Sequence, residues 1–156
     1  MVEPPDGYAF RRADAADAPA IAALVRAAYG HYVERIGREP RPMTDDYDAV
    51  LRDKQVTVAE RDGALAGVVV LAVDDEGFVV DNVAVHPSRR GAGLGRALIA
   101  LAERAAVDAG FDSIYLYTLE QMTENLGLYA RLGYVEYDRR PQGDFSVVFL
   151  RKPLSA

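Results

Sequence analysis

A glycine-rich turn between a buried strand and a helix is the feature that most constrains this sequence. Residues 83–98 read VAVHPSRRGAGLGRAL, so an apolar strand runs into a turn that contains Gly91, Gly93 and Gly95. Glycines let several backbone N–H groups point into one concavity, because no Cβ stands in the way. The N-terminus of the following helix adds free N–H groups and a partial positive charge. The segment therefore predicts a phosphate site, with added charge from Arg89, Arg90 and Arg96.

The glycine spacing disfavours two common nucleotide sites. A Walker loop needs a Lys after its last glycine, and no Lys follows here. A dinucleotide fingerprint needs GxGxxG, but the third glycine is replaced by Arg96 in one alignment and by Leu98 in the other. The alternative of a glycine-rich connection without a ligand is disfavoured, because arginines flank the glycines and a helix starts inside the turn.

Composition narrows the class of protein. The 156 residues suit one domain (1–156), half of them are hydrophobic, and there is no cysteine for disulfides, thiolate metal sites or nucleophiles. The net charge of −6 argues against nucleic-acid binding and for a neutral or cationic substrate, with solubility alone as the alternative. The start MVEPPDGYAF lacks a signal-peptide pattern, and the apolar stretch 64–73 is too short for a membrane span. We therefore expect a cytoplasmic protein that is not bound to a membrane.

Hydrophobic periodicity and turn residues predict alternating strands and helices. Strands are expected at residues 8–12, 56–61, 64–73, 78–85, 113–118, 134–138 and 146–150. Helices are expected around 21–28, from a cap at Thr44 to Leu51, over 93–109 and over 123–132, with a partly helical loop at 30–46. This order predicts an α/β fold in which helices cover the faces of a mixed sheet.

Two motifs in this order resemble one family. Arg90-Gly91-Ala92-Gly93-Leu94-Gly95 matches the R/Q-x-x-G-x-G/A signature of the GNAT superfamily of acyl-CoA-dependent N-acyltransferases, and VAVHP before it is a usual lead-in. Residues 125–134 (NLGLYARLGY) resemble the family's N-x-x-x-x-Y/F-x-x-x-G-F/Y segment. The resemblance extends over the whole chain. It implies an α+β fold, a mainly antiparallel sheet of six to seven strands flanked by about four helices, and acetyl-CoA as the cofactor.

The resemblance also implies how coenzyme A is held. The turn would bind the pyrophosphate through backbone N–H groups, and the preceding strand would pair with the pantetheine arm. An N–H at or near Val85 would polarise the thioester carbonyl. Family strands four and five splay apart, with Thr118 at the gap and Asn125 bonded to the cofactor arm. The expected cofactor-binding residues are Val83, Ala84, Val85, Arg90, Gly91, Ala92, Gly93, Leu94, Gly95, Arg96, Thr118, Asn125 and Tyr129.

Tyr129 and Asp81 are the expected catalytic side chains. The family often has a tyrosine at the position of Tyr129 that protonates the departing thiolate, and a phenol of pKa about 10 suits that step. The alternative for Tyr129 is packing beside Leu126 and Leu132. Asp81 and Asn82 interrupt an apolar strand, and strand geometry predicts that they point to opposite faces. Asp81 is thus a candidate base, directly or through water, with a structural hydrogen bond as an equal alternative.

The family's acceptor wall is built from the first two helices and their connection. Aromatic and arginine side chains there could bind a small acceptor that carries a ring or a carboxylate, while ordinary loop packing is the alternative for each. The expected acceptor-side residues are Tyr29, Tyr32, Arg35, Arg38, Met43, Tyr47 and, from the strand, Asn82. No metal site is expected.

We therefore expect direct transfer of an acetyl group to the primary amine of a small molecule. The lack of cysteine favours a route without a covalent intermediate. Two alternatives remain, which are acetylation of a protein N-terminus or lysine, and a non-catalytic acyl-CoA-binding module. His86 is expected to shape the turn rather than act as the base, and His31 is a weaker candidate for that role. A homodimer is common in the family and is a possible assembly here.

Overall fold

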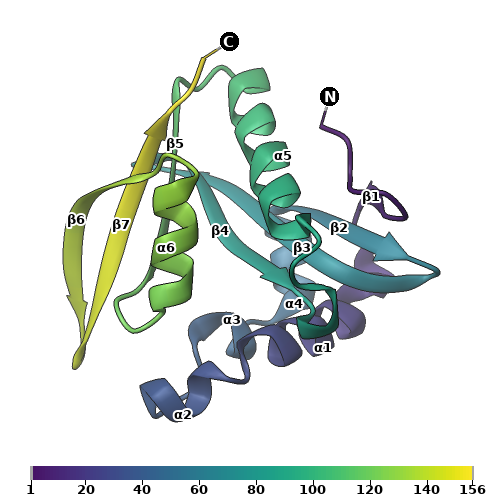
Figure 1. The fold of residues 1–156 in the computed structure, drawn as a ribbon, viewed down its shortest axis with the longest axis horizontal. Coiled ribbons are helices and arrows are strands. Elements are labelled where there is room, and N and C mark those ends of the chain that lie inside the picture. The colour runs from purple at the N-terminus through teal and green to yellow at the C-terminus, as the bar shows by residue number, and fades with distance from the viewer. Residues whose placement is uncertain (1, 156) are drawn as a thin grey trace.

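One seven-stranded sheet forms the frame of the protein (Figure 1). The computed structural model describes residues 2–155, so the first and last residues of the expected 1–156 domain lie outside the described residues. The strand order is β1-β2-β3-β4-β5-β7-β6, and every neighbouring pair is antiparallel except β4 and β5. The mixed, mainly antiparallel sheet expected from the sequence is confirmed.

The elements follow the expected order, with differences at their ends. The strands are β1 (Ala9–Arg12), β2 (Gln55–Arg61), β3 (Ala64–Asp74), β4 (Gly77–Val85), β5 (Ser113–Leu119), β6 (Val135–Gln142) and β7 (Phe145–Pro153). The helices are α1 (Ala18–Tyr29), α2 (Tyr32–Ile36), α3 (Arg41–Thr44), α4 (Tyr47–Asp53), α5 (Leu94–Asp108) and α6 (Thr123–Arg131). The two helices beyond the expected four are α2 and α3, which lie within the loop predicted to be partly helical. No helix within residues 2–155 is long and apolar enough to cross a membrane.

Two local predictions are corrected. Asp46, not Thr44, caps α4, because its carboxylate accepts from the N–H groups of Asp48 and Ala49 while the Thr44 hydroxyl donates to the Arg41 carbonyl. The closing strands are also longer than expected. Pro141 lies inside β6 rather than in the turn, which an edge strand tolerates because proline's missing N–H faces no partner strand.

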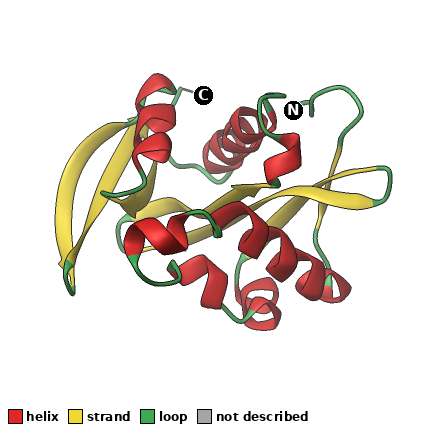
Figure 2. Ribbon diagram, turned by 60° about the horizontal axis from the view of Figure 1, so that its bottom comes forward, coloured by secondary structure: helices red, strands yellow, loops and turns green. Residues whose placement is uncertain are grey.

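The helices cover the two faces of the sheet and bury two apolar clusters. Residues of α5 and α6 pack with one set of strand side chains that includes Val69, Leu71 and Val80. Residues of α1, α2 and α4 pack with the opposite set, which includes Val68 and Val70. Figure 1 shows α5 and α6 in front of the strands, and Figure 2 brings the N-terminal helices forward on the other side. The β6–β7 hairpin extends beyond the N-terminal helices (Figure 2).

The centre of the sheet is irregular where β4 pairs with its two neighbours, β3 and β5. Val70 pairs with Asn82 and Leu71 pairs with Val80, so Asp81 is an extra residue in a β-bulge. Beside it, the parallel strands β4 and β5 pair only at Val79–Tyr115 and Val80–Leu116 and then separate. The splay implied by the family resemblance is therefore present, and the bulge lies at its apex.

Close packing of α5 on β3 generates a stability prediction. A Cβ on Gly67 would lie 3.0 Å from Leu98 Cδ1, 3.2 Å from Leu94 Cδ2 and 3.3 Å from the Ala84 carbonyl oxygen. We expect Gly67→Ala to lower the free energy of unfolding by about 1–3 kcal/mol through overpacking. Urea unfolding measures the effect. The matched control is Gly127→Ala in α6, where the added Cβ meets only the flexible Arg131 side chain, so equal losses in both variants would contradict the packing argument.

Candidate active site

The glycine turn adopts backbone conformations that favour glycine. Gly91 has φ 86° and Gly93, the N-cap of α5, has φ 83°. A Cβ at either position would meet nothing within 4 Å, so the requirement for glycine is the left-handed conformation and not a shortage of space. The open surface leaves the N–H groups of the turn and of the first turn of α5 free to bind an anion.

Side-chain contacts fasten this turn to its surroundings. The His86 imidazole accepts from the Ser88 N–H at 3.1 Å and contacts the Ser88 hydroxyl at 2.8 Å. Arg90 donates from Nη2 to the carbonyl oxygen of Ala28 at the end of α1, at 2.9 Å. The Arg90 guanidinium thus ties the turn to α1, in addition to the charge for which it was singled out.

A cavity of about 440 Å³ opens beside the turn. Its lining combines α1, the end of β4, the glycine turn and α6. The predicted cofactor residues that line it are Val83, Ala84, Val85, Arg90, Gly91, Gly93, Leu94, Gly95, Arg96, Asn125 and Tyr129, and Ala92 is not among them. Arg89 and Arg131 also line it, so a helix N-terminus, glycine N–H groups and guanidinium groups surround one hollow. These donors fit the diphosphate of coenzyme A.

A second cavity, of about 480 Å³, lies on the other side of the gap between β4 and β5. It is called the acceptor cavity below, and the cavity beside the glycine turn is called the cofactor cavity. The acceptor cavity is lined by α3, the bulge of β4, the splayed half of β5 and residues of the C-terminal hairpin. Thr118 lies here rather than in the cofactor cavity, because β5 has diverged from β4 at that point, and its hydroxyl contacts Met122 Sδ at 3.2 Å. Four residues line both cavities: Tyr29, Val83, Asn125 and Tyr129.

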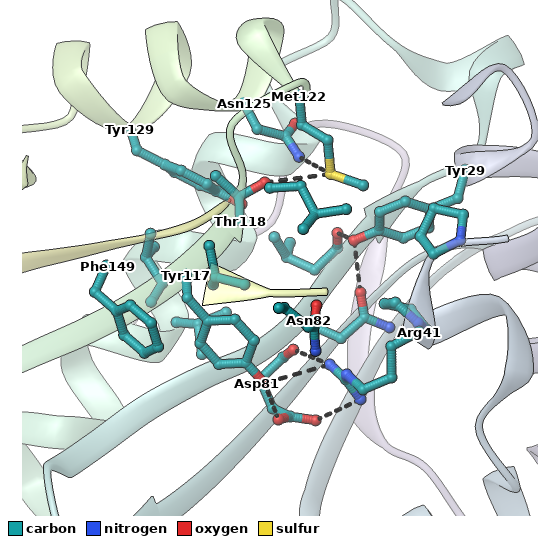
Figure 3. Close-up of a pocket in the computed structure, with 18 of the residues that line it drawn as sticks. Tyr29, Arg41, Asp81, Asn82, Tyr117, Thr118, Met122, Asn125, Tyr129 and Phe149 are labelled. Atoms are coloured by element: carbon teal, nitrogen blue, oxygen red, sulfur yellow. Dashed lines mark hydrogen bonds and ion pairs between the residues drawn. The ribbon is translucent and has the colours of Figure 1, made fainter. Parts of the chain in front are cut away.

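Tyr129 lies at this junction with its side chain buried (Figure 3). Within residues 2–155 its hydroxyl has no hydrogen-bond partner, and burial raises the pKa of its phenol, with a smaller contribution from Tyr32. The hydroxyl therefore stays protonated and is free to donate. Its position fits a proton donor at the point where the two cavities meet.

The bulge turns Asp81 and Asn82 toward the same face of the sheet, so the prediction of opposite faces was wrong. Asp81 contacts Lys54 Nζ at 2.9 Å and accepts from the Tyr117 hydroxyl at 2.9 Å. Asn82, buried, accepts from the Tyr29 hydroxyl at 2.8 Å. Both side chains line the acceptor cavity. Strict alternation fails here because the extra residue of a bulge shifts the side-chain phase by one.

Burial opposes ionisation of Asp81, but Arg41, Lys54 and Tyr117 outweigh it, so the pKa of Asp81 is lowered. Its side chain is only 10% exposed. A carboxylate held by two cations binds a proton weakly, which counts against Asp81 as the direct base.

The structure separates the residues expected on the acceptor wall. Tyr29, Arg38 and Asn82 line the acceptor cavity, whereas Tyr32 lines the cofactor cavity. The remaining three, Arg35, Met43 and Tyr47, line neither cavity. Arg35 is exposed and pairs with Glu124 at 2.6 Å, Met43 packs against the apolar cluster beneath α1, and Tyr47 is buried with its hydroxyl on the Pro42 carbonyl. A loop of two short helices directs neighbouring side chains to different surroundings, which the sequence pattern does not show.

Several residues of the acceptor cavity were not among the site residues expected from the sequence. Arg41 from α3, Tyr117 from β5 and Phe149 from β7 all line the cavity (Figure 3). Arg41 lay in the segment 30–46, which was predicted only to be a partly helical loop. The strand pattern SIYLYT could have suggested Tyr117, because alternate residues of a strand share one face. Phe149 carries no signal beyond its strand.

Residues 20–134 match the profile of the Acetyltransferase (GNAT) family. The chain belongs to this family. An IAA acetyltransferase from Azospirillum brasilense is 32% identical over 108 residues, which cover 65% of this chain and 69% of that protein. The family assignment makes the protein an acetyl-CoA-dependent N-acetyltransferase rather than a non-catalytic binding module.

Solved GNAT structures share the fold. The ribosomal-protein-S18-alanine N-acetyltransferase from Escherichia coli has a TM-score of 0.76 at 19% identity, and the match covers 96% of this chain and 95% of that one. The PaiA N-acetyltransferase from Thermoplasma acidophilum, solved with coenzyme A, has a TM-score of 0.80 at 16% identity, with 94% and 98% coverage. At these identities the likeness concerns the fold.

The two ends of α5 allow a controlled test of the cofactor turn. Gly93 and Gly110 both have positive φ, 83° and 90°, and a methyl group added at either would meet open space, but only Gly93 lines the cofactor cavity. Each Gly→Ala substitution costs about 1–2 kcal/mol of backbone strain. We expect Gly93→Ala to weaken acetyl-CoA binding by about tenfold, as 1.4 kcal/mol corresponds to a factor of ten, while Gly110→Ala keeps wild-type affinity. Titration calorimetry decides, and unchanged affinity in Gly93→Ala would remove the turn from the binding site.

Proposed function

We propose that this GNAT enzyme transfers an acetyl group directly from acetyl-CoA to the primary amine of a small molecule. The observation that carries the proposal is the junction of the two cavities at Tyr29, Val83, Asn125 and Tyr129. A cofactor that enters from the glycine turn and an amine that enters from the other side would meet there. Two reactants held side by side need no intermediate carrier on the protein.

The open edge of β4 supplies the group that would polarise the thioester. The Val83 carbonyl oxygen accepts from the Tyr29 hydroxyl at 3.1 Å, at the junction of the cavities. In extended backbone the N–H and C=O of one residue point to the same edge of the strand. The Val83 N–H therefore faces the gap, where no β5 residue pairs with it. A fixed N–H in a water-poor site stabilises negative charge on an acyl oxygen.

Tyr129 would give its proton to the departing sulfur. Its burial and raised pKa keep the phenol protonated, and its hydroxyl, which has no hydrogen-bond partner within residues 2–155, is free to donate to the sulfur as negative charge develops there. For the amine's proton, the lowered pKa of Asp81 favours release to water rather than direct transfer to that carboxylate.

The charges around the acceptor cavity favour a monoamine. Its two carboxylates are already ion-paired, Asp81 with Lys54 at 2.9 Å and Glu39 with Arg26 at 3.1 Å. A second ammonium group on the acceptor would find no free carboxylate among these lining residues. Much of the remaining wall is apolar or aromatic and includes Leu116, Leu119, Met122, Val147 and Phe149. The best acceptor is thus a single amine with an apolar or aromatic body.

A protein acceptor is the second candidate, but the cavity shape favours a small molecule. Pro40, Pro42 and Thr44 of the α2–α3 segment form one wall of a cavity of about 480 Å³, which suits a small amine better than an extended peptide.

The role of Tyr129 is tested by removing its hydroxyl. We expect Tyr129→Phe to lower kcat by about 10²–10⁴-fold, the usual contribution of a general acid, with acetyl-CoA affinity kept. Steady-state release of free thiol measures turnover. The matched control is Tyr134→Phe, whose buried ring lies 6.1 Å from that of Tyr129 but whose hydroxyl donates to Glu103 outside both cavities. Equal turnover in the two variants would assign the proton donor elsewhere.

The acceptor class is tested with an amine panel after cofactor binding is established. Acetyl-CoA at 100 times its Kd should raise the apparent stability by about 2.7 kcal/mol in thermal unfolding. We then expect aromatic and branched aliphatic monoamines to have higher kcat/KM than polyamines of similar size. A preference for polyamines, or acetylation of peptides alone, would contradict the proposed acceptor class.

A further inference from the structure

We propose that Arg41 is a positioning residue, which clamps α3 onto the bulge of β4 and so holds the acceptor amine in line with the acetyl group. The inference rests on the proposed amine acetylation and adds to it a specific determinant of acceptor geometry. Arg41 is separated by 40 positions from Asp81 and by 76 from Tyr117, yet it contacts both (Figure 3).

The Arg41 guanidinium makes four contacts around the apex of the gap. Nη2 donates to the Asp81 main-chain carbonyl at 2.9 Å and lies 3.5 Å from the Tyr117 hydroxyl. Nη1 lies 3.5 Å from Asp81 Oδ2 and also pairs with Asp45. One planar fork thus joins α3 to β4 and β5, the two strands that separate at this point.

The contact of Arg41 with the Asp81 main chain explains how Arg41 holds the bulge. Asp81 is the extra residue of the bulge, so its backbone has no partner on β3. Without a strand partner, this carbonyl is left for another donor, and Arg41 supplies one. The bulge in turn sets the direction of the next two residues, Asn82, which is held by Tyr29, and Val83, whose N–H faces the gap.

The contacts also show why Arg41 acts on geometry rather than on folding. Its side chain is 39% exposed and lies on the cavity wall, outside both buried apolar clusters. If Arg41 is removed, Asp81 keeps its contacts with Lys54 and Tyr117, so no uncompensated buried charge is left. The fold should survive while the bulge and α3 gain freedom, and a misplacement of about 1 Å can cost about 10²-fold in rate.

The test compares three variants at saturating concentrations of acetyl-CoA. Arg41→Gln removes the planar guanidinium, and Arg41→Lys keeps a charge that cannot bond Asp81 and Tyr117 together. Arg35→Gln removes a charge from the same loop at an exposed side chain that lines neither cavity and has no contact with the bulge. We expect Arg41→Gln to lower kcat/KM for the amine by about 10–100-fold, with a raised acceptor KM, and Arg41→Lys to be intermediate. Arg35→Gln should resemble the wild type in its amine kinetics, and acetyl-CoA affinity should be the same in the Arg41 variants as in the wild type.

A second measurement is independent of turnover. Amide hydrogen exchange at residues 81–83 should be faster in Arg41→Gln than in the wild type or in Arg35→Gln. Exchange and amine kinetics that are equal in the Arg41 and Arg35 variants would overturn the proposal, as would a loss confined to acetyl-CoA affinity. If the wild type acetylates no amine, the proposed function fails, while the exchange rates still decide whether Arg41 holds the bulge.

Discussion

The active site of this protein depends on the separation of two parallel strands after only two paired residues. Beyond Val80 and Leu116, the facing edges of β4 and β5 have no ladder partners. Backbone polar groups removed from water must be satisfied in another way, and each exposed edge is therefore a binding surface. Side chains from α1 and α3 satisfy two carbonyls of β4, through Tyr29 on Val83 and Arg41 on Asp81. The N–H groups that remain face the space for the cofactor.

The glycine turn and the gap work as one unit because β4 leads directly into both. The strand that opens at the bulge ends at Val85, and the turn that starts α5 follows within a few residues. Helix α5 packs closely on β3 at Gly67, because this glycine has no Cβ to hold the Leu94 and Leu98 side chains away. The anion-binding helix N-terminus is thus held at a fixed distance from the open strand edge, as a ligand with a phosphate at one end and a thioester at the other requires.

Charge around the gap is balanced within the protein. Asp81, Asp45, Arg41 and Lys54 form one cluster of two carboxylates and two cations beside the bulge. Such a cluster lowers the pKa of Asp81 and leaves little net charge to attract a charged acceptor. The recognition of the acceptor then falls mainly on the shape of an apolar and aromatic wall, which comes largely from β5, β7 and the segment before α6.

Local signals in the sequence predicted the parts of the site that lie close together along the chain. The glycine turn, the strand before it and Asn125 with Tyr129 on one helix were all expected, and all of the predicted residues among them except Ala92 line the cavities. Errors arose where distant segments meet. Asp81 and Asn82 were assigned to opposite faces because alternation was assumed, but the bulge depends on how β4 pairs with β3. Arg41 showed no local pattern. The arginines expected from the same segment were Arg38, which lines the acceptor cavity, and Arg35, which does not.

The sequence by itself determined the family, the cofactor and the order of strands and helices, because the glycine motif and the hydrophobic period are local properties of the chain. Only the tertiary structure decided which side chains form the acceptor cavity, how Asp81 is neutralised and where β4 and β5 separate. Those features depend on contacts between residues far apart in the sequence, such as Lys54 with Asp81, Arg41 with Asp81 and Tyr29 with Asn82. Such contacts follow from the packing of the N-terminal helices against the sheet, which no local pattern encodes.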